Sequence, residues 1–390
     1  MRLADRMGRL GTESAFEVLA RARALEATGR KIISLGIGEP DFDTPAHIVA
    51  AAEEALRAGH THYVPSPGIP ELREAVTAFL ERHHRIRTAA DRVIVTPGAK
   101  PVMFYAIIAL CQEGDEVIYP DPGFPMYESI ADFAGARPVP IPLREENQFR
   151  MDPEELDALI TDRTKLVILS SPENPCGSAL TASDCERIAR IAMERDVILL
   201  SDEVYWAIRY DGPHASVLDV DGMAERTILL DGWSKTFAMT GWRLGFGVFP
   251  PPLVEPVTRL VINTVSCTSA FSQHAAIAAL TGTWDPVEEM VAEFRKRRDV
   301  VVDGLNRVPG VSCVEPGGAF YVFPNITGLG ASSKAVEEHF LERAGVATVS
   351  GTAFGRHGEG YIRLSYANSV ENIRDALEAM EASLPELATG

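Results

Sequence analysis

Lys235 and Arg243 are the residues of this chain whose types and spacing most directly suggest chemistry. Both lie in the segment 231–243, Asp-Gly-Trp-Ser-Lys-Thr-Phe-Ala-Met-Thr-Gly-Trp-Arg, which follows a short apolar run. A lysine beside a buried sheet can form a Schiff base with an aldehyde cofactor. The arginine can hold a phosphate of that cofactor through a bidentate contact. On spacing alone, two cations on a solvated loop are the better interpretation, so the case depends on residues elsewhere.

Other chemically useful side chains follow apolar runs at the points where strands would end. Gly98, Ala99 and Lys100 open a helical run, where small residues expose backbone N–H groups to an anion such as phosphate. Phe124 stands on a proline-rich turn and could stack on a planar ring. Asn174, in a turn that contains two prolines, could donate to an aromatic oxygen. Each also has an ordinary explanation as a strand–helix turn, a core residue or a turn residue.

Asp202 and Tyr205 follow the fourth of these apolar runs, and Lys235 follows the fifth. An unpaired carboxylate there would be costly, so Asp202 is either a helix N-cap or the partner of a cation such as a protonated ring nitrogen. Ligands of open α/β sheets bind beyond the carboxyl ends of the strands. Together, the five strand ends fit one ligand, a phosphorylated aldehyde of pyridine.

The elements that would position these residues alternate between short strands and helices. Strands are predicted at 92–95, 116–119, 165–169, 197–200, 227–230 and 244–249. Helices are predicted at 13–29, 45–58, 68–84, 100–111, 285–307, 333–344 and 369–383. Most of the strands are continuous apolar runs, which are typical of strands buried on both faces. The alternation predicts an α/β fold with a mostly parallel, doubly wound sheet.

The length of the chain and a change of pattern near residue 285 predict two domains. A chain of 390 residues exceeds the size at which a single core usually stops growing. Residues 46–284 form the predicted large domain. Residues 1–45, as an N-terminal arm, and residues 285–390 form the predicted smaller α+β domain. Short strand signals in that part of the chain lie at 311–314, 319–323 and 361–365.

The composition excludes several kinds of partner. With 37 Lys and Arg against 55 Asp and Glu, the formal net charge is −18, which argues against nucleic acid as a partner. No apolar run is long enough to span a membrane, and no signal peptide is apparent. The five cysteines include no C-x-x-C pair, so we expect reduced thiols and a cytoplasmic protein. We assign no metal site from the sequence.

Five motifs make the chain resemble the class I/II aminotransferases, the fold-type-I pyridoxal-phosphate (PLP) enzymes of the aspartate aminotransferase superfamily. The resemblance runs from about residue 33 to about residue 380. The motifs are Ser-Lys235-x-x-x-Met-Thr-Gly-Trp-Arg243, Gly38-Glu-Pro-Asp-Phe-Asp-Thr-Pro, Asn174-Pro-x-Gly177, Ser-Asp202-Glu-x-Tyr205 and Ile362-Arg363-Leu-Ser-Tyr. The resemblance implies PLP as the cofactor, bound by the large domain.

The resemblance also implies a role for each residue at the cofactor. Lys235 is then the lysine of the internal aldimine and the proton shuttle, and Asp202 keeps the pyridine nitrogen protonated. Tyr205 and Asn174 bond the phenolic oxygen of the ring, and Phe124 stacks on the ring. The phosphate contacts come from Gly98, Ala99, Lys100 and Arg243.

Substrate binding and assembly follow from the same resemblance. Arg363 is the expected clamp for the substrate α-carboxylate, with help from Gly38 and Asn174, although a surface ion-pair arginine is the ordinary interpretation. Tyr63 matches the family tyrosine that crosses to the phosphate of the partner subunit. The resemblance therefore implies a homodimer with shared active sites.

The expected function is a PLP-dependent aminotransferase that moves an amino group from an L-amino acid to a 2-oxo acid. It would work by a ping-pong sequence through the Lys235 aldimine and pyridoxamine phosphate, and would be of the aspartate, aromatic or alanine type. The same core residues would serve a PLP-dependent C–S β-lyase. A PLP-binding regulatory protein without turnover is disfavoured, because Lys235, Asp202 and Arg363 are all present. No basic residue can be assigned to a substrate side chain, so the amino donor stays open.

Overall fold

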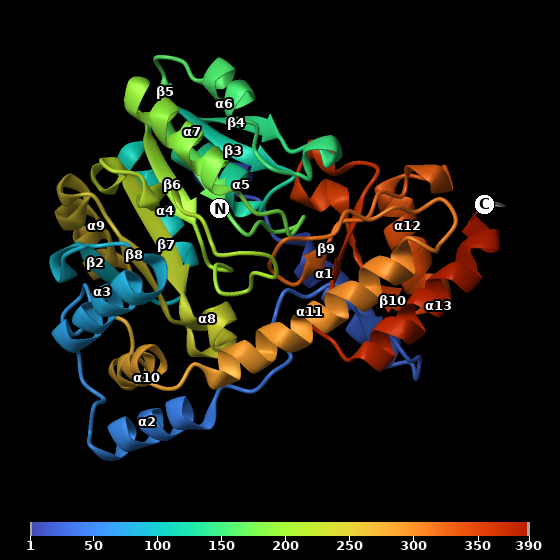
Figure 1. Cartoon of the computed structure of the whole chain (residues 1–390), viewed down its shortest axis with the longest axis horizontal. Coiled ribbons are helices and arrows are strands. Elements are labelled where there is room, and N and C mark those ends of the chain that lie inside the picture. The colour runs from blue at the N-terminus through green and yellow to red at the C-terminus, as the bar shows by residue number, and fades with distance from the viewer. Residues whose placement is uncertain (1, 388–390) are drawn as a thin grey trace.

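A seven-stranded sheet forms the centre of the computed structural model, which describes residues 2–387 (Figure 1). The strand order is β2-β8-β7-β6-β5-β3-β4. Within the described range, β8 alone runs antiparallel to its neighbours, and the other pairs are parallel. The strands are β2 (Val93–Thr96), β3 (Glu116–Asp121), β4 (Arg137–Pro142), β5 (Thr164–Ser170), β6 (Ile198–Asp202), β7 (Thr227–Gly232) and β8 (Gly245–Val248). The predicted strands and the mostly parallel sheet are confirmed.

Strand β4 was not predicted from the sequence, because every second residue in it is a proline. Residues 137–142 read Arg-Pro-Val-Pro-Ile-Pro. Proline cannot donate to a β-ladder and is confined to edge strands or bulges. In the structure β4 pairs in parallel with β3 at the edge of the sheet, where its free side requires no donors.

Helices cover both faces of the sheet, so alternate side chains of a strand enter different hydrophobic cores. In β5, Leu166 and Ile168 pack in the core that includes α4, α5 and α9, whereas Val167 and Leu169 pack in the core that includes α7. Helices α3 and α10 continue the second face over β2 and β7. These helices are α3 (Pro70–His84), α4 (Lys100–Leu110), α5 (Met126–Ala134), α7 (Ala182–Glu194), α9 (Pro251–Thr264) and α10 (Ala270–Thr281). Burial on both faces explains the continuous apolar runs.

Two small sheets lie beside the large one and join the two ends of the chain. Strand β1 (Ile33–Ser34) pairs in parallel with β10 (Val346–Ala347), so the N-terminal segment packs on the C-terminal part of the chain. The other small sheet has the order β11-β12-β9. Its strands are β9 (Tyr321–Val322), β11 (Val349–Ser350) and β12 (Ile362–Ser365). The strand signal at 311–314 was wrong, since Ser312 makes only an isolated bridge with Asn325.

Five of the remaining helices match predicted ranges to within about five residues, and two short ones do not. They are α1 (Ser14–Glu26), α2 (Ala46–Arg57), α6 (Pro153–Leu159), α8 (Trp233–Thr236), α11 (Asp285–Leu305), α12 (Ser333–His339) and α13 (Val370–Leu387). The short helices α6 and α8 were not predicted. In Figure 1 the long helix α11 runs from the region of α8 toward α12 and α13, so it bridges the large sheet and the small ones.

Two general expectations can be compared with the structure. No helix within residues 2–387 is long and apolar enough to cross a membrane. All five cysteines are free thiols, and four of them are buried. The cytoplasmic location stays a prediction.

Candidate active site

The strand ends converge on one cavity of about 430 Å³, and nearly all of the predicted site residues line it. The exceptions are Gly98 and Tyr63. Gly98 lies close to the guanidinium of Arg243. The Tyr63 side chain is 88% exposed and does not line the cavity of its own chain. The structure therefore brings together residues that are spread from position 38 to position 363. Parallel strands deliver several of them to the same edge of the large sheet, whereas Arg363 comes from β12 of a small sheet and Gly38 from a loop.

Lys235 lies in the short helix α8, which begins directly after β7. Its Nζ atom donates a hydrogen bond to the carbonyl oxygen of Gly38 at 2.5 Å. The pKa of Lys235 is lowered to about 8, mainly by burial. The nearby Arg363 and Lys100 add to this lowering, and the charge of Glu39 opposes it. A lysine with a depressed pKa has a larger fraction of neutral amine, which is the nucleophilic and basic form.

Asp202 is the last residue of β6, and its side chain is almost completely buried. Tyr127 donates its hydroxyl to Oδ2 of Asp202 at 2.8 Å, and the backbone N–H of Val204 donates to Oδ1 at 3.3 Å. Burial raises the pKa of Asp202 to about 6 although these two hydrogen bonds oppose the shift. The carboxylate thus has polar partners but no cation in direct contact among residues 2–387, and a cationic ligand would stabilise it.

Tyr127 was not assigned a role from the sequence, although it ends the proline-rich turn that carries Phe124. Its ring is fully buried in α5 and packs edge-on against the Phe124 ring, with the ring centroids 5.7 Å apart. A buried tyrosine hydroxyl almost always has a polar partner. That rule indicates that Tyr127 has a partner but does not say that the partner is Asp202.

Arg363 is a buried arginine that makes no ion pair with a carboxylate among the described residues. Its Nη1 donates to Oδ1 of Asn174 at 2.9 Å, and its Nη2 donates to the carbonyl oxygen of Gly36. Its Nε is buried and has no hydrogen-bond partner within residues 2–387. The guanidinium lies 4.6 Å from the ring centre of Tyr321 and 4.7 Å from that of Phe354. An anion that enters the cavity would supply the missing acceptor.

Tyr321 is a second residue that the sequence analysis did not assign. Its hydroxyl shares a hydrogen bond of 2.7 Å with the hydroxyl of Tyr205. Burial raises the pKa of Tyr205 well above its usual value, and the neighbouring Tyr321 raises it further. Tyr321 comes from β9, 116 residues after Tyr205, so no local motif could have linked them.

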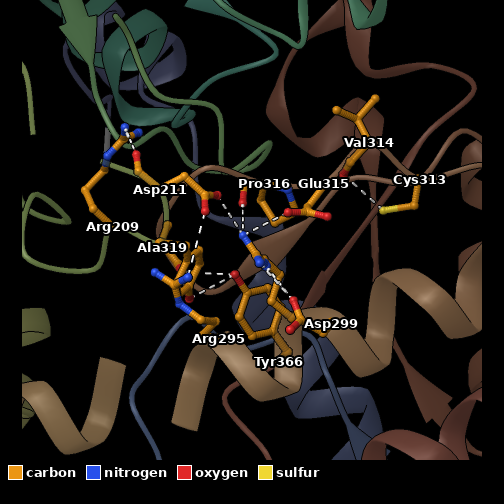
Figure 2. A network of polar contacts seen from close by, with 12 residues as sticks. Arg209, Asp211, Arg295, Asp299, Cys313, Val314, Glu315, Pro316, Ala319 and Tyr366 are labelled. Carbon is orange, nitrogen blue, oxygen red and sulfur yellow. Dashed lines mark hydrogen bonds and ion pairs between the residues drawn. The ribbon is translucent and has the colours of Figure 1, made fainter. Parts of the chain in front are cut away.

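A network of polar contacts holds the segment before Tyr321 in place (Figure 2). Arg298 of α11 donates to Asp211 at 3.0 Å and pairs with Glu315 at 3.1 Å. Tyr210 donates its hydroxyl to the carbonyl oxygen of Ala319 at 2.5 Å, and Tyr366 donates to the same carbonyl at 3.1 Å. Helix α11 is thereby tied both to the loop after Tyr205 and to the residues that lead into β9.

Glycines shape the part of the cavity that lies at the start of α4. Ala99 is the N-cap of this helix, so the backbone N–H of Lys100 has no partner within the helix and can bind an anion. Pro101 has no N–H, and the N–H of Val102 donates to the carbonyl oxygen of Ala99. Gly98 has φ +94°, and a Cβ atom added there would lie 2.2 Å from Nη2 of Arg243. A Cβ on Gly245 would lie 2.4 Å from the backbone nitrogen of Ala99. Only glycine at these positions lets Arg243 and β8 approach the turn so closely.

The side chain of Lys100 points away from this turn. It forms an ion pair with Glu13 of the N-terminal arm, directly before α1, and its Nζ lies 5.3 Å from the centre of the Phe124 ring. Only the backbone of Lys100 was predicted to contact a phosphate, and this side-chain position leaves that prediction open. Glu13 and Phe16 of the arm also line the cavity, which was not anticipated.

Comparison with known proteins identifies the family. The family model described as aminotransferase class I and II matches residues 30–380. The chain belongs to the class I and II aminotransferases. It is therefore a PLP-dependent aminotransferase, which exchanges amino groups between amino acids and 2-oxo acids. The similar proteins carry aminotransferase names, and they support this activity rather than the β-lyase alternative.

Several relatives cover almost the full length of this aminotransferase. An aspartate aminotransferase of Pyrococcus horikoshii is 44% identical, with 98% of this chain and 97% of that protein covered. An aromatic-amino-acid aminotransferase of Thermococcus litoralis is 43% identical over 99% of both chains. The solved aspartate aminotransferase of Thermus thermophilus with maleate has a TM-score of 0.95 at 37% identity, over 98% of this chain and 100% of that one. The predicted fold type is thus confirmed.

The close contact between Gly98 and Arg243 leads to a prediction for cofactor affinity. Gly98→Ala is expected to weaken PLP binding at least tenfold, because the new methyl group would displace the guanidinium of Arg243 and strain the turn. Affinity would be measured from the visible absorption of PLP titrated into cofactor-free protein.

Gly114→Ala is the matched control. Gly114 has φ +95°, so its substitution imposes a similar backbone strain, but a Cβ there would meet nothing within 4 Å. Its PLP affinity should stay within about twofold of the wild type. Equal losses in the two variants would show that strain alone, and not the position of Arg243, determines the effect.

Proposed function

We propose that PLP binds in this cavity with its ring nitrogen at Asp202 and its aldehyde carbon at Lys235. The phosphate then lies at the turn 98–100, beside Arg243. The buried carboxylate of Asp202 supports this orientation, because its raised pKa marks a site that favours a positive partner. The depressed pKa of Lys235 supports its role as the nucleophilic amine.

The remaining cofactor contacts follow from the same placement. Asn174 uses its carbonyl oxygen to accept from Arg363, which leaves its amide N–H groups to donate to the phenolic oxygen of the ring. Tyr205 supplies the second donor to that oxygen, and Tyr321 fixes the position of the Tyr205 hydroxyl. Phe124 is the stacking ring.

When bound, PLP supplies an electron-withdrawing ring that stabilises negative charge at the substrate Cα. Arg363 binds the substrate carboxylate and so fixes which bond at Cα faces Lys235. The neutral amine of Lys235 then removes the Cα proton as a general base and returns a proton as a general acid. The burial of Asp202 and Arg363 strengthens their electrostatic contacts, because little water screens them.

One observation carries the proposed substrate orientation: the fully buried Arg363 has an unpartnered Nε and no carboxylate partner among residues 2–387. A buried guanidinium of this kind is costly unless an anion completes its contacts. An amino acid bound by its α-carboxylate would do so, with its Cα within reach of Lys235 in the same cavity.

We propose aromatic amino acids as the preferred donors within the aspartate, aromatic and alanine types. Lys100, Lys235, Arg243 and Arg363 are the cations that line the cavity among the described residues. Lys100 is already paired with Glu13, and the other three have proposed roles at the cofactor or the α-carboxylate. None of these four cations remains for a side-chain carboxylate, and the ring of Phe16 offers an apolar contact.

We also propose that the enzyme is a homodimer in which Tyr63 binds the phosphate in the site of the partner. The Tyr63 ring is 88% exposed and does not line the cavity of its own chain, so it is available for contact with a second subunit. The division into a large domain (46–284) and a small domain with the N-terminal arm (1–45 and 285–390) is supported by the β1–β10 pairing.

The donor preference is tested by adding single amino acids to the PLP-loaded enzyme and recording its visible absorption. We expect conversion to the pyridoxamine form with release of the matching 2-oxo acid, and kcat/KM at least tenfold higher for phenylalanine than for aspartate. Lys235→Ala should keep its fold by circular dichroism and lose turnover. A higher kcat/KM for aspartate would refute the donor preference and leave the aminotransferase activity standing.

The carboxylate clamp is tested with Arg363→Ala. Loss of charge-assisted hydrogen bonds is expected to raise KM for amino acids on the order of 10–150-fold, with PLP affinity unchanged. Arg356→Ala is the control, because the Arg356 side chain is exposed and only weakly paired with Asp121. If Arg363→Ala instead releases PLP with no change in KM, the clamp role is wrong.

Shared sites are tested by mixing two inactive or impaired variants. Lys235→Ala lacks the reactive amine, whereas Tyr63→Phe should lose PLP affinity in the site of its partner. In a mixed dimer, the chain that retains Lys235 would receive an intact Tyr63 from the other subunit. The two variants are dissociated, mixed and allowed to reassemble. We expect that about one site in each hybrid dimer then binds PLP with wild-type affinity. No restoration would mean that Tyr63 acts in its own chain or has no role.

A further inference from the structure

A second cluster of titratable side chains lies behind the active site. His84 is the last residue of α3, Glu203 follows β6, and His214 lies in the loop after it. One donor atom from each of the three residues lies within 4.8 Å of the others. Glu203 Oε2 is 2.7 Å from His214 Nε2 and 3.7 Å from His84 Nδ1.

This cluster faces away from the cofactor cavity. Asp202 and Glu203 are consecutive residues, and consecutive side chains of an extended segment point to opposite faces of a sheet. Asp202 meets Tyr127 of α5 on one face, whereas Glu203 meets the end of α3 on the other. None of the three residues in the cluster lines the cofactor cavity.

The unusual member is His84, whose side chain is completely buried. Neither of its ring nitrogens has a hydrogen-bond partner within the described part of the chain, and its distance of 3.7 Å from Glu203 is too long for one. The ring packs against Trp206, with centroids 3.9 Å apart. Buried polar atoms without a partner are rare and often mark an ion or a water.

Two neighbouring serine hydroxyls orient the carboxylate of Glu203. Ser201 and Ser216 both donate their hydroxyls to Oε1 of Glu203, at 2.7 and 2.6 Å. These contacts turn Oε2 toward the two histidines, as supporting hydrogen bonds orient carboxylate ligands in metal sites.

We propose that His84, Glu203 and His214 bind one divalent transition-metal ion of the Zn²⁺ class. Two imidazoles and one carboxylate form a donor set that suits zinc, with a water in the fourth position. Donors about 2.0–2.2 Å from a tetrahedral ion lie roughly 3.4 Å apart, and the observed 2.7 and 3.7 Å bracket that separation. The ion would take the place of the hydrogen bond between Glu203 and His214, with both imidazoles bound in their neutral form.

A hydrogen-bonded pair without a metal explains only part of the cluster. It accounts for Glu203 and His214, but it leaves both nitrogens of His84 without a partner in the core. An ion at Oε2 of Glu203 gives His84 a partner as well. The bound ion would join the end of α3, the loop that carries His214, and the backbone next to Asp202. Its role is therefore to position Asp202 and stabilise the fold, without contact with the substrate.

The test uses the PLP-loaded enzyme after dialysis against a chelator. Zn²⁺ is added, free metal is removed on a desalting column, and the retained zinc is measured by mass spectrometry. We expect about one zinc per chain for the wild type, and an unfolding temperature that rises by several degrees with zinc. Co²⁺ in place of Zn²⁺ should give visible ligand-field bands at longer wavelengths than the cofactor absorption.

His84→Phe is expected to abolish zinc retention and the rise in unfolding temperature, because phenylalanine fills the space beside Trp206 but offers no ligand atom. His83→Phe is the matched control, since His83 stacks on Trp284 next to the cluster and should leave both readings unchanged. His214→Asn is a second test on a less buried ligand. The proposal is overturned if the wild type retains no zinc, or if His84→Phe and His214→Asn retain as much as the wild type.

Discussion

Three charged groups, those of Asp202, Lys235 and Arg363, lie in one cavity without forming a direct ion pair with each other. Asp202 and Arg363 are buried, and Lys235 is partly buried. Each such group is costly to bury, and the surrounding elements offset that cost with hydrogen bonds. Tyr127 donates to Asp202, and the carbonyl oxygens of Gly38 and Gly36 accept from Lys235 and Arg363. The arrangement keeps each charge available for a ligand. A cofactor and an amino acid would complete the contacts that the protein leaves open.

The support for this cavity comes from both parts of the chain. The parallel strands bring Phe124, Asn174, Asp202 and Lys235 to one edge of the large sheet. The small sheet contributes Arg363 from β12 and Tyr321 from β9. Helix α11 connects the two parts, because its Arg298 contacts Asp211 in the loop after Tyr205 and Glu315 in the segment that leads into β9.

Asp202 and Glu203, at the end of β6, have different surroundings because consecutive side chains of a strand point to opposite faces of the sheet. Asp202 faces the cofactor cavity, whereas Glu203 faces a buried histidine cluster that joins α3 to the loop of His214. The sequence analysis assigned no metal there, because the three residues are far apart in the chain and form no short ligand motif. Only the folded chain brings His84 to Glu203.

The sequence alone determined the family and the mostly parallel sheet, and it predicted most of the residues that line the cavity. It could do so because parallel strands buried on both faces give continuous apolar runs, and because several of the cavity-lining residues follow those runs directly. It missed β4, whose alternating prolines conceal an edge strand, and it assigned no role to Tyr127 or Tyr321. The tertiary structure decided those contacts, the pairing of Lys100 with Glu13 and the isolation of His84. These features depend on side chains from distant segments that come into contact only in the folded chain. No local pattern in a single sequence predicts such contacts.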